Sequence, residues 1–527
     1  MAQSSPGIHV VTTERTYKGK TYRTHLLRRS YREGGQVKKE TLANLSPLGD
    51  EMVGMIRQAL GGKVLRPMEE QFEVVRSWHH GHVQAVWEAM RQLGMERLLG
   101  SHDCRERRLV MGLIVARIVQ PQSKLATVRS WEQTTLGQVL GVSPRDEREL
   151  YGALEWLLKR QSRIERHLTE RHLVEGGLVL YDLRSSYFEG QHCPLAAYGY
   201  NRDGKRGKLQ VNYGLVNPVK GCPVAVSVVA GNVSDTKTLL PQVETIRERF
   251  GIKRLVLVGD RGMISQTQIK ALRDWPGVEW ITALRGPSIR KLVSEGKVKP
   301  EQFEKQTLFE LLHPDFPDER LVVCRNPDLA RHRAQKRQEL LQATQQELET
   351  VRRLVERGRL HDARDIGVRA GKVINRYKVG KHFDLTIHDG HFHFQINTQK
   401  VDAEAALDGI YIVRTSLSES LISAAEAVRS YKRLSQVERA FRSLKTTDLK
   451  IRPIFHRLSD RVRAHLFLGV LAYSVQWHMM QVWRPLLFSD EELETQATRD
   501  PVAPAERSAS AQHKAASKVL PDGSSAN

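Results

Sequence analysis

Cysteine is scarce in this chain of 527 residues, and the four cysteines, Cys104, Cys193, Cys222 and Cys324, lie far apart. They form no CxxC pair, so we expect neither a disulfide framework nor a cysteine zinc site. The glycine-rich sequences GxxxxGKS/T and GxGxxG are also missing, so no nucleotide cofactor is expected. These absences indicate a protein of a reducing compartment.

Long apolar runs are missing as well. The first residues contain no continuous apolar stretch, so we expect no signal peptide. The most apolar late segment, residues 466–480, is shorter than the ~20 residues that a transmembrane helix needs, and it contains Gln476 and His478. A buried helix explains this segment better. We therefore expect a cytoplasmic protein without a membrane partner.

Acidic residues are too few to balance the basic ones. The chain has 82 Lys and Arg against 60 Asp and Glu, which gives a formal net charge of +22. Such a surplus favours a polyanionic partner, because neutralising phosphates releases counterions and drives association. Nucleic acid is the first candidate, and an anionic membrane surface is the alternative. With DNA as the partner, the protein would be associated with the nucleoid.

The length suggests at least three structural units, and the residue patterns divide the chain further. Short alternating runs with a Gly34-Gly35 turn predict a hairpin near the beginning, and apolar residues at three- and four-residue steps predict helices after it. The expected segments are a basic β-rich segment (1–75), a helical module (76–175), the first part of an α/β core (176–285), an insertion (286–405), the second part of the core (406–484) and a disordered tail (485–527).

The predicted core is a mixed α/β sheet. Three strands, GLVLYDL, LQVNYGLV and CPVAVSVVAG, precede a helix that Asp235 can cap, and the strands RLVLVGD and VEWITAL follow with a short helix between them. The alternation then stops, and a polar helix and the hairpin FDLTIHDGHFHFQI mark the insertion. The strand GIYIVRT resumes the pattern of the core.

Two aspartates lie at or near the ends of predicted core strands. Asp182 belongs to LVLYDLRSSYFEG, and Asp260 follows the apolar run LVLVG. Each could be an ordinary turn former or helix cap. Strand ends at one edge of a sheet converge in space, however, so the pair is also a candidate site.

The segment YKRLSQVERAFRSLKTTDLK supplies a third carboxylate. At ~100° per residue, its apolar residues cover one arc of a helix, and a second row of side chains lies beside that arc. The arc consists of Leu434, Val437, Phe441 and Leu444, and the row of Tyr431, Glu438 and Lys445. An amphipathic helix with a Glu438–Arg442 pair would explain the charges but not a carboxylate at the margin of the core.

Three carboxylates on neighbouring elements suit Mg²⁺ or Mn²⁺, which prefer oxygen ligands. Two such ions can activate a water or a 3′-hydroxyl and stabilise the leaving oxygen in a displacement at phosphorus. Asp182, Asp260 and Glu438 are therefore the candidate catalytic metal ligands. Tyr431 and Lys445 would hold the phosphate, and Arg442 would neutralise charge nearby.

These residues resemble the DDE transposases of bacterial insertion sequences. The likeness is to the group with a Y-x2-R-x3-E-x6-K signature and a β-strand-rich insertion between the second Asp and the Glu. The sequences YDLRSSYFEG, AAYGYNRDGKRGKLQVNYGLV, LVGDRGM and YKRLSQVERAFRSLK carry it across residues 177–480.

This resemblance implies an RNase H-like catalytic core interrupted by an α+β insertion. It also implies that the protein depends on a divalent metal, nicks DNA at the ends of its insertion sequence and transfers the cut strands into target DNA. The N-terminal module would recognise the terminal inverted repeats of double-stranded DNA, and a homo-oligomer, expected to be a dimer, would bring two ends together.

Two positions depart from the family pattern. The arginine of the signature falls on Leu434, and Arg433, one residue earlier, points about 100° away from that position on a helix. Arg184 occupies a position where many relatives have a small hydroxyl residue. Arg184 could contact a phosphate or crowd the site.

Other side chains were considered for DNA contacts. The basic loop NRDGKRGK contains Arg202, Lys205 and Arg206, which are expected to touch DNA, although a solvated turn would look the same. His456 lies in RPIFHR, where a DNA contact and a surface cluster are equally compatible with the sequence. Trp275 and Trp280 suit core packing better than stacking on a DNA base. A metal site is geometrically possible at His388, His391 and His393, although exposed imidazoles of this kind seldom bind metal.

Two functions other than transposition fit parts of this pattern. A catalytically silent DNA-binding protein descended from a transposase, acting as a repressor, would have the same charge and N-terminal module. The intact set of three carboxylates favours the enzyme, and Arg184 keeps the silent protein open. A stand-alone RNase H-like nuclease is a third possibility, which the large insertion argues against.

Overall fold

The computed structural model describes residues 7–65, 74–487, 499–504 and 508–519. The chain forms two compact units, Met1–Trp78 and His79–Asn527, which are described separately. All four cysteines are free thiols. Among the described residues, no helix is both long and apolar enough to cross a membrane.

The first unit is a three-stranded antiparallel sheet with one helix. Its strands are β1 (Gly7–Tyr17), β2 (Lys20–Glu33) and β3 (Gln36–Asn44), and Glu33 pairs with Gln36, which confirms the predicted Gly34-Gly35 hairpin. A 3₁₀ turn (Ser46–Leu48) and the helix α1 (Gly49–Leu60) follow, which the alternating pattern did not predict. The buried His25 joins them, because its Nε2 lies 2.8 Å from Oδ1 of Asp50.

The second unit begins with helices that pack around one late helix. That late helix, α17 (Ser459–Leu487), is buried along residues 464–475, so the predicted buried helix is confirmed. Helices α2, α4 and α7 contact it directly, because an apolar helix needs protein on all sides. The early helices are α2 (Gly81–Gln92), α3 (Met95–Leu99), α4 (Arg105–Val119), α5 (Lys124–Trp131), α6 (Leu136–Leu140), α7 (Glu147–Leu158) and α8 (Gln161–His172).

An eight-stranded mixed sheet forms the centre of the second unit, in the order β6-β5-β4-β7-β8-β13-β10-β9. The neighbours β4, β7 and β8 are parallel, and the other pairs are antiparallel. Three antiparallel strands followed by parallel ones are the arrangement of an RNase H-like core, as expected. The strands are β4 (Leu178–Tyr187), β5 (Gln210–Pro218), β6 (Ala225–Ala230), β7 (Leu255–Val258), β8 (Val278–Ala283), β9 (Leu308–Leu311), β10 (Arg320–Arg325) and β13 (Ile410–Thr415).

Helices connect and cover these strands. The helices α15 and α16 carry the segment with the third carboxylate, and they pack against β8, β13 and β4. The bounds are α9 (Asp235–Glu244), continued by a π-helical turn (Thr245–Arg249), α10 (Gln266–Leu272), α11 (Gly286–Ser294), a 3₁₀ turn (Pro300–Phe303), α15 (Ala424–Lys432), α16 (Leu434–Arg442) and a π-helical turn (Ser443–Thr447).

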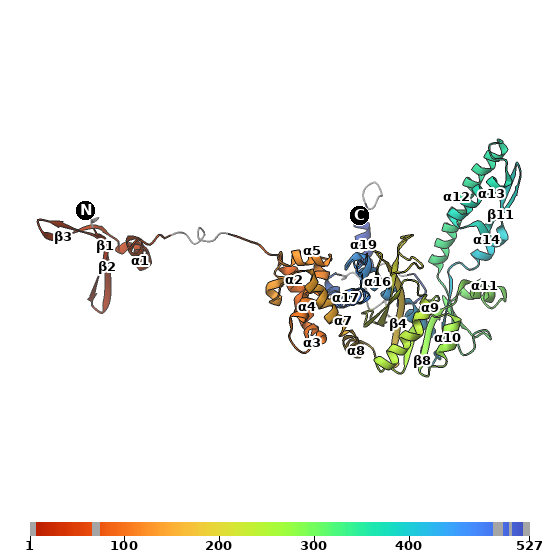
Figure 1. The fold of residues 1–527 in the computed structure, drawn as a ribbon, viewed down its shortest axis with the longest axis horizontal. Helices are drawn as coiled ribbons and strands as arrows, with labels where there is room; N and C mark the ends of the chain where they lie inside the picture. Colours follow the sequence, from red (N-terminus) through yellow and green to blue (C-terminus); the bar gives the residue numbers. More distant parts are fainter. Residues whose placement is uncertain (1–6, 66–73, 488–498, 505–507, 520–527) are drawn as a thin grey trace. The chain divides into compact units, whose positions relative to one another are not determined.

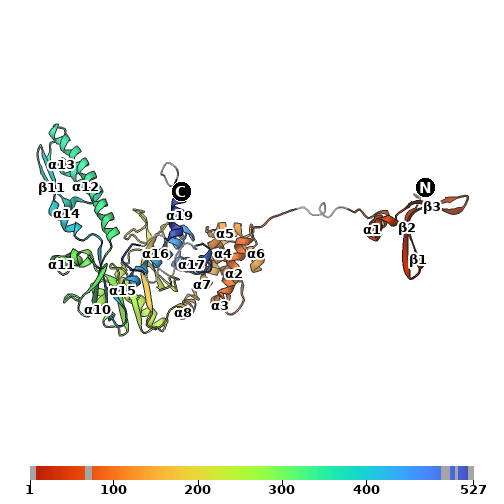
Figure 2. The same cartoon turned by 180° about the vertical axis from the view of Figure 1, so that it is seen from behind.

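The expected insertion at 286–405 begins too early. Strands β9 and β10 lie within that range, but they pair with β13 and extend the central sheet. The arm that projects from the sheet instead spans residues 327–405 and has an apolar core of its own (Figures 1 and 2). It contains α12 (Pro327–Glu356), α13 (Ala363–Tyr377), a 3₁₀ turn (Gly380–His382), the predicted hairpin β11 (Phe383–His388) and β12 (His391–Ile396), and α14 (Thr398–Ala405).

The expectation of a disordered tail from residue 485 is wrong for the described part of that segment. Helix α17 continues to Leu487, and α19 (Ala509–Ser517) forms further on. Val502 is fully buried, and its carbonyl accepts a hydrogen bond from Nδ2 of Asn326 at 2.8 Å. The buried side chain of Val502 and hydrogen bonds to Arg499, Asp500 and Pro501 therefore fix residues 499–504 to the core.

Candidate active site

The parallel pairing of β4 and β7 brings the two aspartates level with each other. Leu180 pairs with Val258, so two residues further along the strands Asp182 faces the position of Asp260. Asp182 lies in the middle of β4 rather than at its end, whereas Asp260 begins the turn after β7. The strand register, and not only the strand ends, makes the two carboxylates neighbours.

Asp260 has a structural role as well as a position in the site. Its Oδ1 accepts hydrogen bonds from the backbone N–H groups of Gly262 and Met263 at 3.0 and 2.8 Å. A Cβ at Gly259 would lie 2.8 Å from Cδ1 of Ile264, so glycine allows the chain to turn closely here. Asp260 is thus a turn former whose other carboxylate oxygen accepts no backbone hydrogen bond in this turn.

Glu438 reaches the same region from α16. The apolar side of this helix packs on the sheet through Phe441, whose ring lies 5.6 Å from that of Tyr213 on β5. Glu438 lies at the edge of this packed side, and 57% of its side chain is exposed. In the predicted arc of apolar residues beside the glutamate, Val437, Phe441 and Leu444 are buried as expected, whereas Leu434 is half-buried and lines a cavity.

Asp182, Asp260 and Glu438 line one cavity of about 230 Å³. Tyr431, Arg184 and Ser435 also line it, together with Leu434 and Lys432. Lys432 and Ser435 were not among the predicted site residues, although both lie on the predicted helix. The three carboxylates that were selected from separate parts of the sequence therefore meet at one site.

Arg184 lies between two of these carboxylates. Its Nη2 is 3.0 Å from Oδ2 of Asp182 and 3.1 Å from Oε1 of Glu438. Its Nη1 also donates to Oδ1 of Asp182 at 3.3 Å. The guanidinium is thus a positive charge that joins β4 to α16 at the centre of the cavity.

Burial has a strong effect on the first carboxylate. It raises the pKa of Asp182 to about 7, with Arg184 opposing this rise and Asp260 adding to it. Burial also raises the pKa of Tyr431, and the charges of Asp260 and Glu438 raise it further. A buried carboxylate beside a second one favours a cation between them.

The donor set fits a divalent metal ion, with one condition. Among the described residues, no three His, Cys, Asp or Glu side chains stand close enough together to hold one ion. Arg184 separates Asp182 from Glu438, and it is itself a cation held by carboxylates. Carboxylate oxygens are the ligands that Mg²⁺ and Mn²⁺ prefer, so the site fits such ions once the guanidinium moves aside.

Lys445 does not line the carboxylate cavity. Its Nζ lies 2.5 Å from Oδ1 of Asp203, which also binds Nη1 of Arg452 at 2.6 Å. Burial lowers the pKa of Lys445, and Asp203 opposes this. The regular helix assumed from sequence is interrupted at Arg433 and continues as a π-helical turn at Ser443–Thr447, which shifts Lys445 out of the predicted row.

The predicted arginine contacts differ in their surroundings. Arg433 pairs with Glu426 at 3.2 Å, and Arg442 is exposed at the end of α16 and does not line the carboxylate cavity. Arg202 binds the carbonyl of Leu183 and the carboxylate of Asp235, so Asp235 does not cap α9 as expected and instead holds the basic loop.

The other predicted residues lie away from the carboxylates. Lys205 and Arg206 are exposed on their loop, and His456 lines a different cavity. Trp280 is buried in the sheet, which confirms core packing for that residue. His388 and His391 stack with their ring centres 6.4 Å apart at the hairpin turn, without a metal site among the described residues.

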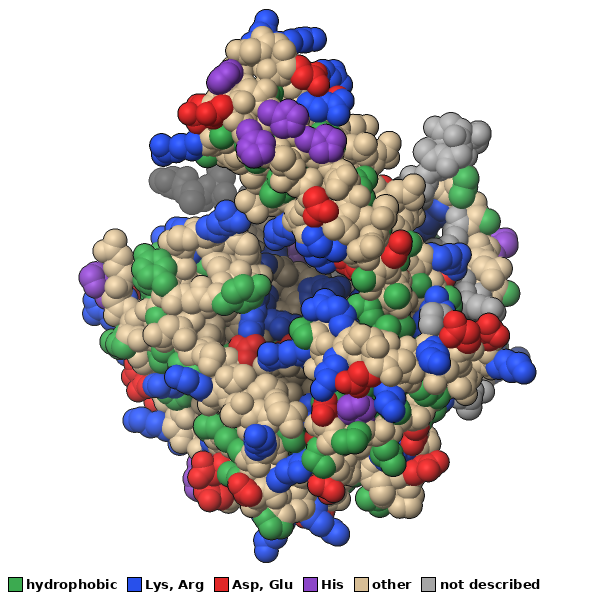
Figure 3. Space-filling model, turned by 90° about the vertical axis from the view of Figure 1, so that its right-hand side faces the viewer, with side chains coloured by type: hydrophobic (Ala, Val, Ile, Leu, Met, Phe, Trp, Pro, Cys, Tyr) green, Lys and Arg blue, Asp and Glu red, His purple; other side chains and the backbone are tan. Residues whose placement is uncertain are grey.

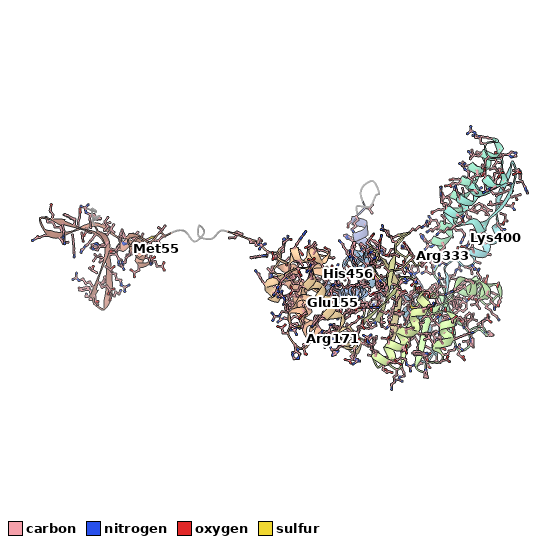
Figure 4. The ribbon with its side chains drawn as sticks, viewed as in Figure 1. Met55, Glu155, Arg171, Arg333, Lys400 and His456 are labelled. Carbon is pink, nitrogen blue, oxygen red and sulfur yellow. The ribbon has the colours of Figure 1, made fainter. Side chains whose placement is uncertain are left out.

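A basic cavity adjoins the carboxylate site between the sheet and the arm. It measures about 840 Å³ and includes Tyr431, which also lines the carboxylate cavity. Figure 3 shows this face hollowed, with Lys and Arg side chains around the hollow, and Figure 4 shows Arg333 and Lys400 on the arm side. Its cations, which sequence reasoning missed, are Arg261, Arg290, Arg333, Lys336, Arg337, Lys378, Lys381 and Lys400. They come from the turn after β7, from α11, α12 and α14, and from the segment that follows α13, and residues so far apart in the sequence form no recognisable motif.

Comparison with known proteins gives two family matches. Residues 187–475 match the model of the transposase DDE domain, and residues 10–72 match that of the N-terminal domain of IS1634 family transposases. The first match includes Asp260 and Glu438 and begins just after Asp182. No curated protein sequence matches the chain.

One solved structure with a similar chain is the cryo-EM structure of piggyBac transposase synaptic complex with hairpin DNA. The identity is 9% and the TM-score 0.39, over 83% of this chain and 86% of that one. The DDE domain match alone covers more than half of the 527 residues. The chain therefore belongs to the DDE transposases of bacterial insertion sequences.

Proposed function

We propose that Asp182, Asp260 and Glu438 are the catalytic metal ligands of this transposase. The observation that carries the proposal is that these three carboxylates, from β4, the turn after β7 and α16, line one cavity. We further propose two Mg²⁺ or Mn²⁺ ions. When bound, the ions would activate a water or a 3′-hydroxyl and stabilise the leaving oxygen.

The other side chains of the cavity would position the DNA. Arg184 would leave the carboxylates when metal enters. Its guanidinium lies beside Asp182 and Glu438, so it would remain close enough to neutralise the charge of the reacting phosphate. The hydroxyl of Tyr431 would donate a hydrogen bond to a phosphate oxygen, because burial raises its pKa and keeps the phenol protonated. Arg442, exposed at the end of α16, would contact the backbone further out.

The DNA would run along the basic cavity between the sheet and the arm. Its Lys and Arg side chains favour phosphate contacts, which supports double-stranded DNA as the substrate. We propose that the N-terminal unit and the helices of residues 81–172 recognise the terminal inverted repeats, and that cleavage is followed by strand transfer into target DNA. A homodimer acting in the cytoplasm would bring the two ends together.

Cleavage of DNA that carries the inverted repeats flanking the gene tests this proposal. The unmutated protein with Mg²⁺ is expected to cut at the repeat ends, and Glu438→Gln is expected to bind the same DNA without cutting. Glu419→Gln, at an exposed loop position, is the matched control and should cut normally. Normal cutting by Glu438→Gln would exclude Glu438 as a catalytic ligand, and binding without cutting by the unmutated protein would exclude an active enzyme.

A further inference from the structure

A second basic cavity lies away from the carboxylates, between the early helices and the segment after α16. It measures about 870 Å³ and is lined by residues from α4, α5, α7, α17 and the loop 450–457. Figure 4 shows His456 at this junction, with Glu155 close by. Its charged and aromatic lining consists of Arg117, Lys124, Glu147, Tyr151, Lys450, Arg452, Phe455, His456, Arg457, Arg461 and His465.

Two of these cations are buried without a carboxylate partner. Arg117 is 6% exposed and Lys124 is 5% exposed. The guanidinium of Arg117 reaches only the backbone carbonyls of Leu449 and Gln122, both at 3.4 Å, and within the described parts of the chain neither cation forms an ion pair. Buried charges are normally paired, because removing them from water is costly.

The remaining charges do not compensate for them. Glu147 is the one acidic residue of the lining, and Glu155 outside it is engaged with Arg461 at 3.2 Å. Burial lowers the pKa of Lys124 well below its usual value, and the charge of Arg117 lowers it further. The cavity thus holds a guanidinium and an amine that lack an anionic partner, and an anion bound there would favour the charged form of Lys124.

Two histidines line the cavity, and one of them has a nitrogen without a hydrogen-bond partner. The rings of His456 and His465 lie 4.8 Å apart, and Nε2 of His465 is 3.0 Å from the carbonyl of Ile451. The buried Nδ1 of His465 has no partner in the described structure. Phe455, 65% exposed, provides an aromatic surface at the same cavity.

We propose that this cavity binds one nucleotide of the DNA strand, with its phosphate against Arg117 and Lys124 and its base near Phe455. An anion is the ligand that offsets buried unpaired cations, and bases stack on exposed aromatic rings. The inference rests on DNA as the substrate but not on catalysis. A free phosphate ion or a mononucleotide shares the chemistry and is separated from DNA by the tests below.

The cavity lies within reach of DNA that is held at the carboxylates. Phe188, at the end of β4, pairs with Ile454, beside the cavity lining. Phe188 follows Asp182 by ~20 Å of extended strand, which equals the rise of about six base steps along the axis of a DNA duplex. Arg452 of the lining also binds Asp203 of the basic loop, so this loop lies between the two sites.

The first test measures binding of inorganic phosphate and of inverted-repeat DNA by calorimetry without divalent metal, at one salt concentration. Lys124→Met is expected to weaken both at least tenfold. It should also raise the melting temperature, because it removes a buried amine that has no carboxylate partner. The control Lys253→Met removes an exposed charge at the opposite end of β7 from Asp260 and should leave phosphate binding unchanged. Unchanged binding of both ligands by Lys124→Met would overturn the proposal.

The second test uses DNA in which single phosphates are replaced by neutral methylphosphonates. One replacement, about six nucleotides from the cleavage site, should weaken binding by the reference protein that keeps Lys124, but it should not further weaken binding by Lys124→Met. Retained phosphate binding without such a position would assign the cavity to a free ion or nucleotide and overturn the DNA assignment. Both tests are performed in the Glu438→Gln background, so they succeed or fail independently of cleavage.

Discussion

At the scale of single residues, the most informative side chain is Arg184. Its guanidinium binds carboxylate oxygens of Asp182 and Glu438, which are the oxygens proposed to hold a metal ion. A guanidinium has one positive charge and N–H donors fixed in one plane. A divalent ion has two charges and binds oxygen ligands from several directions. At the proposed metal site, metal entry would therefore require that two ion pairs break first, and their free energy would lower the apparent metal affinity.

Replacing this arginine is expected to strengthen metal binding. In Arg184→Ser the competing cation is absent, so Mn²⁺ should bind about fivefold more tightly, the equivalent of ~1 kcal/mol for partly exposed ion pairs. The free Mn²⁺ signal in electron paramagnetic resonance measures this directly. Arg206→Ser, which removes an exposed charge from the basic loop, should bind Mn²⁺ as the unmutated protein does. Equal or weaker Mn²⁺ binding by folded Arg184→Ser would show that Arg184 does not compete.

At the scale of elements, the early helices depend on one close contact. Gly112 lies on α4 against the ring of Trp131, and a Cβ there would come 2.1 Å from Cη2 of Trp131. Trp131 is 1% exposed, and its Nε1 donates to the carbonyl of Val142 at 3.0 Å, so the ring cannot move aside easily. The packing of α4, α5 and α6 thus requires glycine at this position.

Two alanine substitutions of helical glycines should have opposite effects. Gly112→Ala is expected to destabilise the protein by about 2 kcal/mol or more, as overpacking of a core does. Gly152→Ala on α7 meets nothing within 4 Å and should stabilise it by ~1 kcal/mol, because alanine favours a helix more than glycine does. Urea denaturation of both variants measures the difference. If Gly112→Ala were as stable as Gly152→Ala, the tight packing described here would be wrong.

Much of the element pattern could be predicted from sequence, for a physical reason. The run before Asp260 is a buried strand because four apolar residues are flanked by turn residues, and α16 was predicted from the spacing of its apolar residues. The pairing of Arg184 with Glu438 could not be predicted, because it depends on how α16 packs on β4. The π-helical turn that takes Lys445 to Asp203, and the burial of Val502, likewise leave no local signal.

At the scale of the whole molecule, the second basic cavity makes stability depend on pH. Burial lowers the pKa of His456 to about 3 and that of His465 well below its ordinary value, and Lys124 and Arg117 lower both further. Both histidines are therefore neutral when folded and take up protons when unfolded. Their contribution to stability is complete above the unfolded pKa of ~6.5 and is lost as the pH falls from there towards 3.

A variant with a non-titrating side chain checks this dependence. His465→Gln keeps an N–H donor for the carbonyl of Ile451 but takes up no proton. Between pH 7 and pH 5 it should lose about 2 kcal/mol less of its free energy of unfolding than the unmutated protein, as expected for one histidine held neutral. Chemical denaturation at the two pH values gives the comparison. Equal losses in both proteins would mean that His465 titrates normally in the folded state.

The second unit combines a DDE core, a projecting arm and a group of early helices. The buried helix α17 packs against both the early helices and the core sheet. Its central site depends on residues from β4, the turn after β7 and α16, which are far apart in the sequence. The proposed activity requires that Asp182, Asp260 and Glu438 together bind divalent metal.

Iron-directed cleavage of the protein backbone tests this claim most directly. Fe²⁺ replaces Mg²⁺ at carboxylate sites, and with ascorbate and peroxide it cuts the chain next to its ligands. We expect cuts beside Asp182, Asp260 and Glu438 that excess Mg²⁺ suppresses together. Suppressible cuts elsewhere in the chain, with any one of these three positions left uncut, would contradict the proposed metal site.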